Sequence, residues 1–359
     1  MVTIEKLGNY IERLDRPNTN LRYGIDDVCG ITNTKQLVLG TKANLIGRTF
    51  EKFSILAPRE FIFNRRTSRN GERISLGYNT TDREWILTED YCHFRVRKDK
   101  EELLDPDFLY LFFLDPEFDR YARFNSWGSA TEFFNWEEMI ETPVPILPIS
   151  KQRAIVHKYQ VITSKIELLK NTNKALDAIA YTQYKKLLKS GNKAGWHMGT
   201  LSELIAVKYG KDHSSLKDGT IPLYGSGGLM RFVERPLYNK VSVLIPRKGS
   251  LNNIMYVDEP FWSVDTMYYT EVFNPKAAKF IYYYLKDIDF LGLNTGSAVP
   301  STSSDVVLGL ELCIPSDDAI DAFDRLVTPI FSQIKINLQM CGRLERIKVL
   351  ISSFIGKGV

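Results

Sequence analysis

Residues 155–188 read IVHKYQVITSKIELLKNTNKALDAIAYTQYKKLL, a stretch in which apolar side chains recur at alternating intervals of four and three residues. The recurring positions are Ile155, Tyr159, Ile162, Ile166, Leu169, Asn173, Leu176 and Ala180. This spacing is that of the a and d positions of a heptad repeat, which line the seam between paired helices. Because one helix alone cannot bury such a stripe, the stretch predicts a long helix with a helical partner.

A matching stripe lies near the other end of the chain. Its positions are Phe323, Val327, Ile330, Ile334, Asn337, Cys341, Leu344, Ile351 and Ile355. Leu344 follows Leu176 by 168 positions, and neighbouring residues align at the same offset. We therefore expect two long helices that pair within the chain. Since proline disrupts a helix interior, we expect the second regular helix to begin at Pro329, with this residue in its first turn.

Each predicted seam contains one asparagine, Asn173 in the first helix and Asn337 in the second. A polar residue at a core position lowers stability but can fix the register of paired helices. Alternatively, the asparagines mark a loosely packed part of the seam. The sequence leaves both interpretations open.

The duplication extends beyond the helices. Gly128-Ser129-Ala130 recurs 168 positions later as Gly296-Ser297-Ala298, and PVPILP at 143–148 aligns with LELCIP at 310–315. The aromatic run at 108–114 likewise resembles that at 280–286. The chain is therefore predicted to be an α+β protein with an internal pseudo-repeat, in which a globular part of mixed helices and strands twice precedes a long helix.

Short β-type runs alternate with polar turns in both copies. We expect strands at 37–39, 53–56, 60–64, 73–78, 93–97, 241–246, 253–257 and 267–273. Residues 3–14 are expected to form a short helix with Thr3 as its N-cap. Pro106 and Pro116 are expected to open helices, because proline is favoured at the first helical position.

The composition is that of a globular protein, with 44% hydrophobic and 25% charged residues in 359 positions. No apolar run approaches the roughly 20 residues that a membrane helix needs, and the first residues lack the apolar core of a signal peptide. Four scattered cysteines, with no CxxC pair, are expected to be reduced thiols of a cytoplasmic protein. The net charge of +4 permits a nucleic-acid partner only if basic residues cluster.

Motifs of common catalytic and metal sites are missing from the sequence. It contains no GxxxxGK[ST] phosphate loop, no HExxH zinc motif and no GxSxG nucleophile motif. The Asn-Pro-Pro-aromatic motif of amino-methyltransferases is also missing, because Asn274-Pro275 is followed by Lys276. We therefore assign no catalytic or metal-binding residue.

Two polar, basic segments are the better candidates for a binding site. Residues 64–73 read NRRTSRNGER, and residues 247–253 read RKGSLNN, each between expected strands. Arginine and asparagine are suited to bidentate contacts with guanine and adenine in the major groove, while arginine, serine and threonine also bind phosphates. The candidates are Arg65, Arg66, Arg69, Asn70 and Arg73, then Arg247, Lys248, Ser250, Asn252 and Asn253. One such loop is usually a solvated turn, but one in each copy favours a reader with two sites.

The glycine-rich stretch Tyr224-Gly225-Ser226-Gly227-Gly228 has two interpretations. It lacks the lysine and Ser/Thr pair of a phosphate loop, so a tight turn with positive φ at its glycines is one of them. The other is a close approach of the backbone to DNA phosphate, which adds Tyr224, Ser226 and Gly227 to the candidates.

The chain resembles the specificity subunit of type I restriction-modification enzymes. The resemblance rests on segments that occur in the expected order over nearly the whole chain. They are FNSWGSATEFFNWEEM with PVPILPISKQRAIV (within 124–156), IPLYGSGGLM (221–230), VLIPRKGS (243–250), FWSVDTMYY (261–269) and NTGSAVPSTS (294–303). TEFFNW at 131–136 has no counterpart in the second copy, so we expect the two halves to read different sequences.

This resemblance implies two target-recognition domains, at 1–149 and 191–316, connected by two long antiparallel coiled-coil helices, at 150–190 and 317–359. It also implies a non-catalytic chain that reads a bipartite, asymmetric target in double-stranded DNA. The family's partners are two adenine-N6 methyltransferase subunits and, in the restricting complex, restriction/translocase subunits. S-adenosylmethionine, ATP and Mg are then expected on those partners, with no cofactor on this chain.

Two alternatives remain open at this point. One is a DNA-binding adaptor of the same fold that serves outside restriction. The other is a duplicated carbohydrate- or protein-binding module with a coiled coil. Binding that is insensitive to salt would favour the latter, because phosphate contacts make the affinity for DNA fall steeply with salt.

Overall fold

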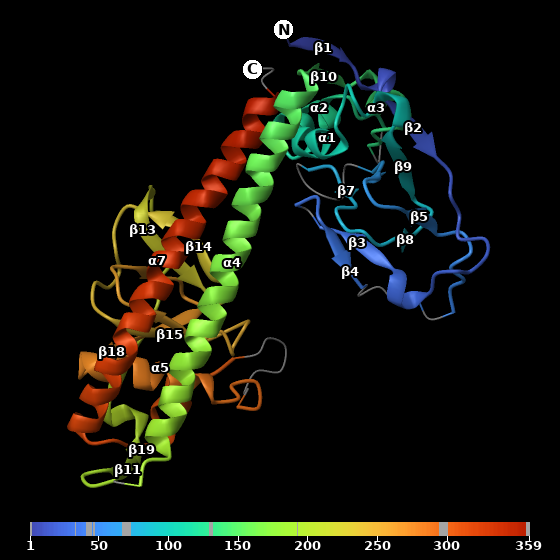
Figure 1. Cartoon of the computed structure of the whole chain (residues 1–359). Helices are drawn as coiled ribbons and strands as arrows, with labels where there is room; N and C mark the ends of the chain where they lie inside the picture. The colour runs from blue at the N-terminus through green and yellow to red at the C-terminus, as the bar shows by residue number, and fades with distance from the viewer. Residues whose placement is uncertain are drawn as a thin grey trace. The chain divides into compact units, whose positions relative to one another are not determined.

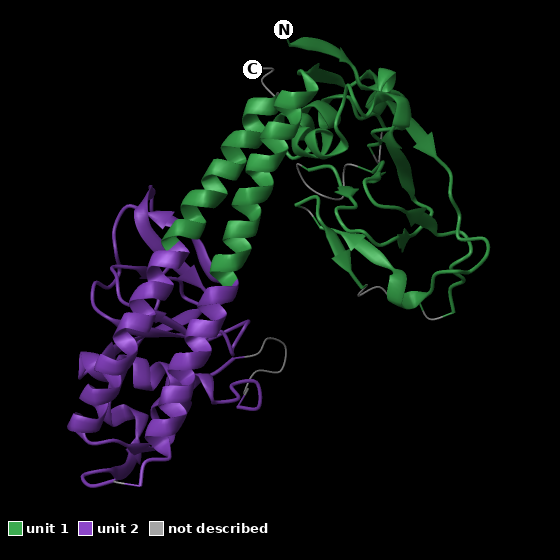
Figure 2. Ribbon diagram, viewed as in Figure 1, with its two compact units in different colours: residues 1–170, 339–359 green, residues 171–338 purple. Residues whose placement is uncertain are grey.

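The computed structural model describes residues 2–32, 34–40, 45, 47–66, 73–128, 132–191, 193–293 and 301–356. The chain forms two compact units, unit 1 from residues 1–170 and 339–359 and unit 2 from residues 171–338 (Figure 2). Two helices of 40 residues each, α4 (Ile149–Leu188) and α7 (Asp317–Gly356), are labelled in Figure 1, and both contribute residues to both units (Figure 2). The expected mixture of helices and strands with two long helices is confirmed.

Unit 1 is built on an antiparallel sheet of four strands. Its order is β2 (Ile11–Leu14), β9 (Tyr91–Val96), β6 (Phe61–Asn64) and β7 (Leu76–Tyr78). Three pairs of strands accompany it: β1 (Thr3–Lys6) with β10 (Pro143–Ile146), β3 (Cys29–Ile31) with β4 (Leu37–Leu39), and β5 (Ser54–Leu56) with β8 (Trp85–Leu87). The core between the sheet and the helices is aromatic, with Phe61 stacked on Phe94 and edge-on to Phe113.

Unit 2 repeats this arrangement. Its four-stranded sheet has the order β12 (Ile205–Tyr209), β18 (Met267–Val272), β15 (Ser242–Pro246) and β16 (Met255–Val257), and β11 (His197–Thr200) pairs with β19 (Glu311–Ile314). A second sheet is formed by β14 (Gly228–Val233), β13 (Asp218–Gly225) and β17 (Trp262–Ser263). Both four-stranded sheets pair their strands in the same order along the chain, so the duplication seen in the sequence is a duplication of structure.

The short helices begin where the prolines predict. In α1 (Pro106–Phe113) the Asp105 carboxylate accepts from the Asp107 and Phe108 backbone N–H groups, and in α2 (Pro116–Phe124) Asp115 accepts from Glu117. Such caps satisfy N–H groups that have no partner within the helix. The remaining short helices are α3 (Trp136–Glu141), α5 (Ala278–Lys286) and α6 (Ser304–Leu308).

The expected helix at 3–14 is wrong. This segment forms β1, a single 3-10 turn at Leu7–Asn9 and then β2. Tertiary pairing outweighs local preference here, because β1 pairs with β10 and the Leu7 N–H donates to the Thr142 carbonyl at 2.9 Å. Gly8 permits this close approach, since a Cβ on it would lie 2.8 Å from the Ile140 Cβ.

The long helices pair antiparallel along the predicted seam. In unit 1, Ile162, Ile166 and Leu169 pack against Cys341 and Leu344. The Lys348 ammonium lies 4.9 Å from the ring centre of Tyr159, whereas Lys170, further along α4, pairs with the earlier Glu345 at 3.8 Å. In unit 2, Ala180 and Tyr184 of α4 join the core that contains Phe323 and Val327 of α7.

The expectation that the second long helix begins at Pro329 is also wrong, because α7 begins at Asp317 and contains this proline. Phe323 and Val327 are buried before the proline, and Ile330 and Phe331 pack against the same core after it. Proline removes one backbone hydrogen bond from a helix, and the apolar burial on both sides offsets that loss. Among the helices of the described ranges, none combines the length and the apolar character needed to cross a bilayer.

Candidate nucleic-acid interface

The two polar segments occupy the same connection in the two sheets. Residues 65–75 join β6 to β7 in unit 1, and residues 247–254 join β15 to β16 in unit 2. Strand order therefore places the two candidate segments at equivalent positions. Arg69 and Asn70 lie outside the described residues.

In unit 1 the ends of this connection are held by backbone contacts. The Phe134 N–H donates to the Arg65 carbonyl at 2.8 Å, and the Arg66 N–H donates to Asn64 Oδ1 at 3.0 Å. Near the far end of the connection, the Ile74 N–H donates to Asp119 Oδ1 at 3.0 Å, which positions the adjacent Arg73. Arg65, Arg66 and Arg73 are exposed, and none forms an ion pair with another described residue.

In unit 2 two candidate segments that are distant in sequence meet. The Asn253 Nδ2 donates to the Ser226 carbonyl at 2.9 Å. Gly249 has a φ of +86°, and a Cβ on it would lie 2.9 Å from the Ser226 Oγ. The buried Leu251 anchors the segment in the core between the exposed Ser250 and Asn252. Lys248 is exposed as well.

The glycine-rich stretch forms the tight turn between β13 and β14. Gly225 pairs with Gly228, whose φ is +115°, and Ser226 and Gly227 lie between them. The Tyr224 side chain is half-buried beside Phe261, and burial raises the pKa of its hydroxyl to about 12. Tyr224 is therefore a neutral phenol at neutral pH that supports the turn from the core.

Arg247 is the least free of the candidate cations. Its guanidinium lies 5.2 Å from the ring centre of Tyr209, and its Nη1 donates to the Asp265 carbonyl at 3.5 Å. Its backbone also bonds to Thr266 and Thr302. These contacts fix the start of the loop from which Lys248 extends.

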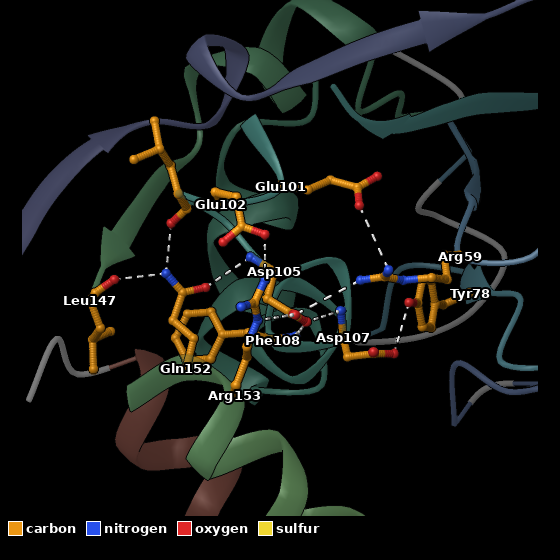
Figure 3. A network of polar contacts seen from close by, with 11 residues as sticks. Arg59, Tyr78, Glu101, Glu102, Asp105, Asp107, Phe108, Leu147, Gln152 and Arg153 are labelled. Carbon is orange, nitrogen blue, oxygen red and sulfur yellow. Dashed lines mark hydrogen bonds and ion pairs between the residues drawn. The ribbon is translucent and has the colours of Figure 1, made fainter. Parts of the chain in front are cut away.

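A polar network at the base of unit 1 was not assigned any role from the sequence (Figure 3). Gln152, in the first turn of α4, is fully buried. Its Nε2 donates to the carbonyls of Leu103 and Leu147 at 2.7 and 2.8 Å, and its Oε1 accepts from the Asp105 N–H at 2.9 Å. The amide nitrogen of Gln152 therefore donates two hydrogen bonds, and its oxygen accepts one.

Charged side chains extend the network toward the sheet. Arg153 pairs with Glu102 at 2.8 Å, and Arg59 lies 3.6 Å from Glu101 and 3.8 Å from Asp105. The network thus connects the turn before β6, the start of α1 and the start of α4 (Figure 3). The sequence signal for this network is the run Lys151-Gln152-Arg153 directly after the proline-rich strand.

No group of residues with metal-binding composition occurs within the ranges that the structure describes. No protein-family model matches the chain, and no curated protein matches its sequence.

Solved structures do match. The chain is similar to the S subunit of a type I restriction-modification system from M. genitalium, with a TM-score of 0.59, 17% sequence identity, and coverage of 98% of this chain and 95% of that one. The HsdS subunit from Thermoanaerobacter tengcongensis is 15% identical over 100% and 97% of the two chains, with a TM-score of 0.39. A chain from a study of complex assembly and conformational transition of the type I R-M system is 14% identical over 98% and 96%, with a TM-score of 0.46. At 17% identity the first likeness establishes architecture over nearly the full length: this chain has the fold of a type I restriction-modification S subunit.

Proposed function

We propose that this chain is the DNA-recognition subunit of a type I restriction-modification complex. The observation that carries the proposal is the placement of a polar, basic segment in the same connection of both four-stranded sheets. The fold shared with an S subunit supports it, as do the exposed Arg65, Arg66 and Arg73, which form no ion pair with another described residue.

Each segment is suited to reading a few base pairs. In unit 1, Arg65, Arg66 and Arg73 have the side chain that forms bidentate contacts with guanine and binds phosphate, and Arg69 and Asn70 belong to the same segment. In unit 2, the exposed Lys248, Ser250 and Asn252 are proposed to contact DNA, while Asn253, Arg247 and Tyr224 hold the loops in position. Because the two sets differ, the two half-sites differ, and the target is asymmetric.

The paired helices are proposed to set the distance between the half-sites. Helix α4 has 40 residues, which corresponds to a length of about 60 Å. That exceeds the roughly 34–36 Å between successive major-groove faces on one side of the duplex. In this division, 1–149 and 191–316 are the recognition domains, and 150–190 and 317–359 are the connecting helices.

The partners are proposed to be two methyltransferase subunits and the restriction/translocase subunits, which carry the catalysis and the S-adenosylmethionine, ATP and Mg. A groove of about 420 Å³ in unit 1 supports such docking. It is lined by Val2, Leu147, Lys151, Ala154, Ile155, Lys158, Ile351, Phe354 and Ile355. Phe354 is 60% exposed, so the groove offers an apolar floor with two lysines to an amphipathic helix with acidic flanks.

Methylome sequencing tests the proposal. A host that expresses this chain with its cognate methyltransferase is compared with a host that has the methyltransferase alone. We expect a new N6-methyladenine motif in two parts with a constant gap, and exchange of residues 1–149 is expected to change one part only. A stable complex that yields no motif would overturn the proposal, and salt-insensitive binding of another ligand would favour a different binding module.

A further inference from the structure

Two large aromatic side chains of unit 1 are exposed beside the candidate arginines. Phe124, the last residue of α2, is 85% exposed, and Trp127 is 70% exposed. Exposed apolar residues are common, but two aromatic rings at such exposure within four residues require an explanation.

The backbone that presents Trp127 is well fixed. Its N–H donates to the Phe133 carbonyl at 3.1 Å, and its carbonyl accepts from the Phe133 N–H at 2.9 Å. Phe134, which follows Phe133 in the chain, is fully buried in the core and donates its N–H to the Arg65 carbonyl. The backbone from which the exposed indole projects is thus held by two hydrogen bonds to Phe133.

The same ladder brings Trp127 to the reading segment. Phe133 forms an antiparallel bridge with Trp127 on one side and with Arg66 on the other. Phe133 therefore lies between Trp127 and Arg66, and Arg66 is at the start of the β6–β7 connection. This position is decided by pairing between segments that lie about 60 residues apart in the sequence.

Phe124 lies beside arginines as well. It lines a hollow of about 960 Å³ together with Arg73, Arg120 and Arg123. Arg120 pairs with Glu117, whereas Arg73 and Arg123 form no ion pair with a described residue. The hollow also contains Glu132 and the pair Glu345–Lys348. Arginines that line the same hollow as Phe124 and form no ion pair with a described residue favour an anionic polymer over a second apolar protein surface.

We propose that Phe124 and Trp127 form an apolar wedge that enters the groove of the DNA bound by unit 1 and partly unstacks one base step. This inference rests on the proposed function and adds a mode of reading to it. Flanking arginines bind the phosphates, while an aromatic ring inserted at a step kinks the duplex. Pyrimidine–purine steps are the easiest to unstack, so the wedge selects sequence at a step without hydrogen bonds to bases.

Unit 2 shows a comparable arrangement. Leu229 and Met230 are exposed at the start of β14, directly after the Ser226–Gly227 turn. Each candidate reading surface thus combines polar loops with large apolar side chains.

The test uses the complex of this chain with its methyltransferase subunits and duplexes that contain the methylated motif, with 2-aminopurine at successive positions of the first half-site. Unstacking raises 2-aminopurine fluorescence. We expect a several-fold rise at one step with the wild-type complex and none with W127A. We also expect about tenfold weaker binding for W127A or F124A, in line with the loss of one base–aromatic contact. The control F273A removes an aromatic ring that is 61% exposed in unit 2 and is expected to bind as the wild type does.

Salt dependence separates the wedge from phosphate contacts. W127A is expected to weaken binding without changing the slope of log K against log salt, whereas R66Q lowers that slope by about 0.9. If the wild-type complex binds DNA and W127A matches F273A in affinity, the wedge is wrong while the proposed function stands. If the wild-type complex binds no duplex in a salt-dependent manner, the proposed function itself fails. If W127A does not fold, the variant W127F and the fluorescence scan of the wild-type complex test the wedge instead. A wild-type scan in which no step shows raised fluorescence overturns the wedge.

Discussion

Asn337 donates its Nδ2 to the Oδ1 of Asn173 at 2.7 Å, so the two asparagines of the helix seams bond to each other. Asn337 Oδ1 in turn accepts from Gln333 Nε2 at 2.9 Å, and Asn173 Nδ2 lies 3.4 Å from the Ile334 carbonyl. The asparagines are therefore a paired polar layer in the apolar seam. Only one register of the two helices brings these two amides together. The pair therefore favours the interpretation that the asparagines fix the register, rather than that they mark a loosely packed part of the seam.

The asparagine pair is expected to stabilise the folded chain. N173L leaves the buried Asn337 without its acceptor and is expected to destabilise the chain by about 1–3 kcal/mol. The double variant N173L/N337L replaces both amides by apolar groups and is expected to recover most of that loss. Denaturant unfolding of the wild type, both single variants and the double variant measures the coupling. Strictly additive losses would contradict the paired layer.

Gln152 is expected to be essential for the base of unit 1. Q152L keeps the volume but leaves the carbonyls of Leu103 and Leu147 and the Asp105 N–H without their partner. Unpaired buried groups of this kind cost about 1–3 kcal/mol each, so we expect a loss of several kcal/mol in unfolding free energy. Q160L, at an exposed position of the same helix, is the matched control and is expected to unfold like the wild type.

Acid is expected to destabilise unit 1 through Glu60. Burial alone would raise the pKa of this carboxyl, but hydrogen bonds with His93 and the Ala57 N–H and the charge of Arg16 outweigh burial and lower the pKa below 4.5. A lowered pKa contributes stability that is present above about pH 4.5 and is lost as the pH falls through the folded-state value. The thermal unfolding midpoint of the wild type is therefore expected to decrease as the pH is lowered below 4.5. The decrease is expected to be smaller in E60Q. Equal acid sensitivity of E60Q and wild type would assign the effect to other carboxyls.

Phosphate binding by the first reading segment predicts a change in salt dependence. R65Q/R66Q removes two exposed guanidinium groups and is expected to lower the slope of log K against log salt by about 1.8. R346Q, which removes an exposed arginine of α7, is the control and is expected to leave the slope unchanged. Fluorescence anisotropy with a labelled duplex at salt concentrations from about 50 to about 200 mM measures the slopes of both variants. An unchanged slope in the double variant would place these arginines away from the phosphates.

Helix length is expected to control the gap of the target. Insertion of one heptad into each long helix beside the asparagine pair adds about 10 Å to each helix and preserves the a/d seam. That length equals the rise of roughly three base pairs. Methylome sequencing is expected to show both half-sites unchanged with a gap longer by about three base pairs. A constant gap would exclude the role of the helices as a ruler.

The two long helices, the duplication and the class of fold could be predicted from the amino-acid sequence alone. A heptad stripe is a local, periodic signal that a helix converts directly into one buried face, so Ile162, Ile166 and Leu169 pack on the seam as their spacing predicts. Asp105-Pro106 and Asp115-Pro116 are local signals as well, because a cap and the fixed φ of proline act within one turn. The polar segments in both copies could likewise be located from the sequence.

Features that depend on partners distant in the chain could not be predicted, because they arise only when the chain folds. Residues 3–14 became strands because β10 offers them a backbone partner, and Pro329 stays inside a helix because apolar packing on both sides offsets its missing hydrogen bond. The meeting of Asn253 with Ser226, the buried amide of Gln152 and the ladder that presents Trp127 all arise from contacts across dozens of residues. Local propensity carries no information on such contacts, since their free energy exists only once the whole unit is folded.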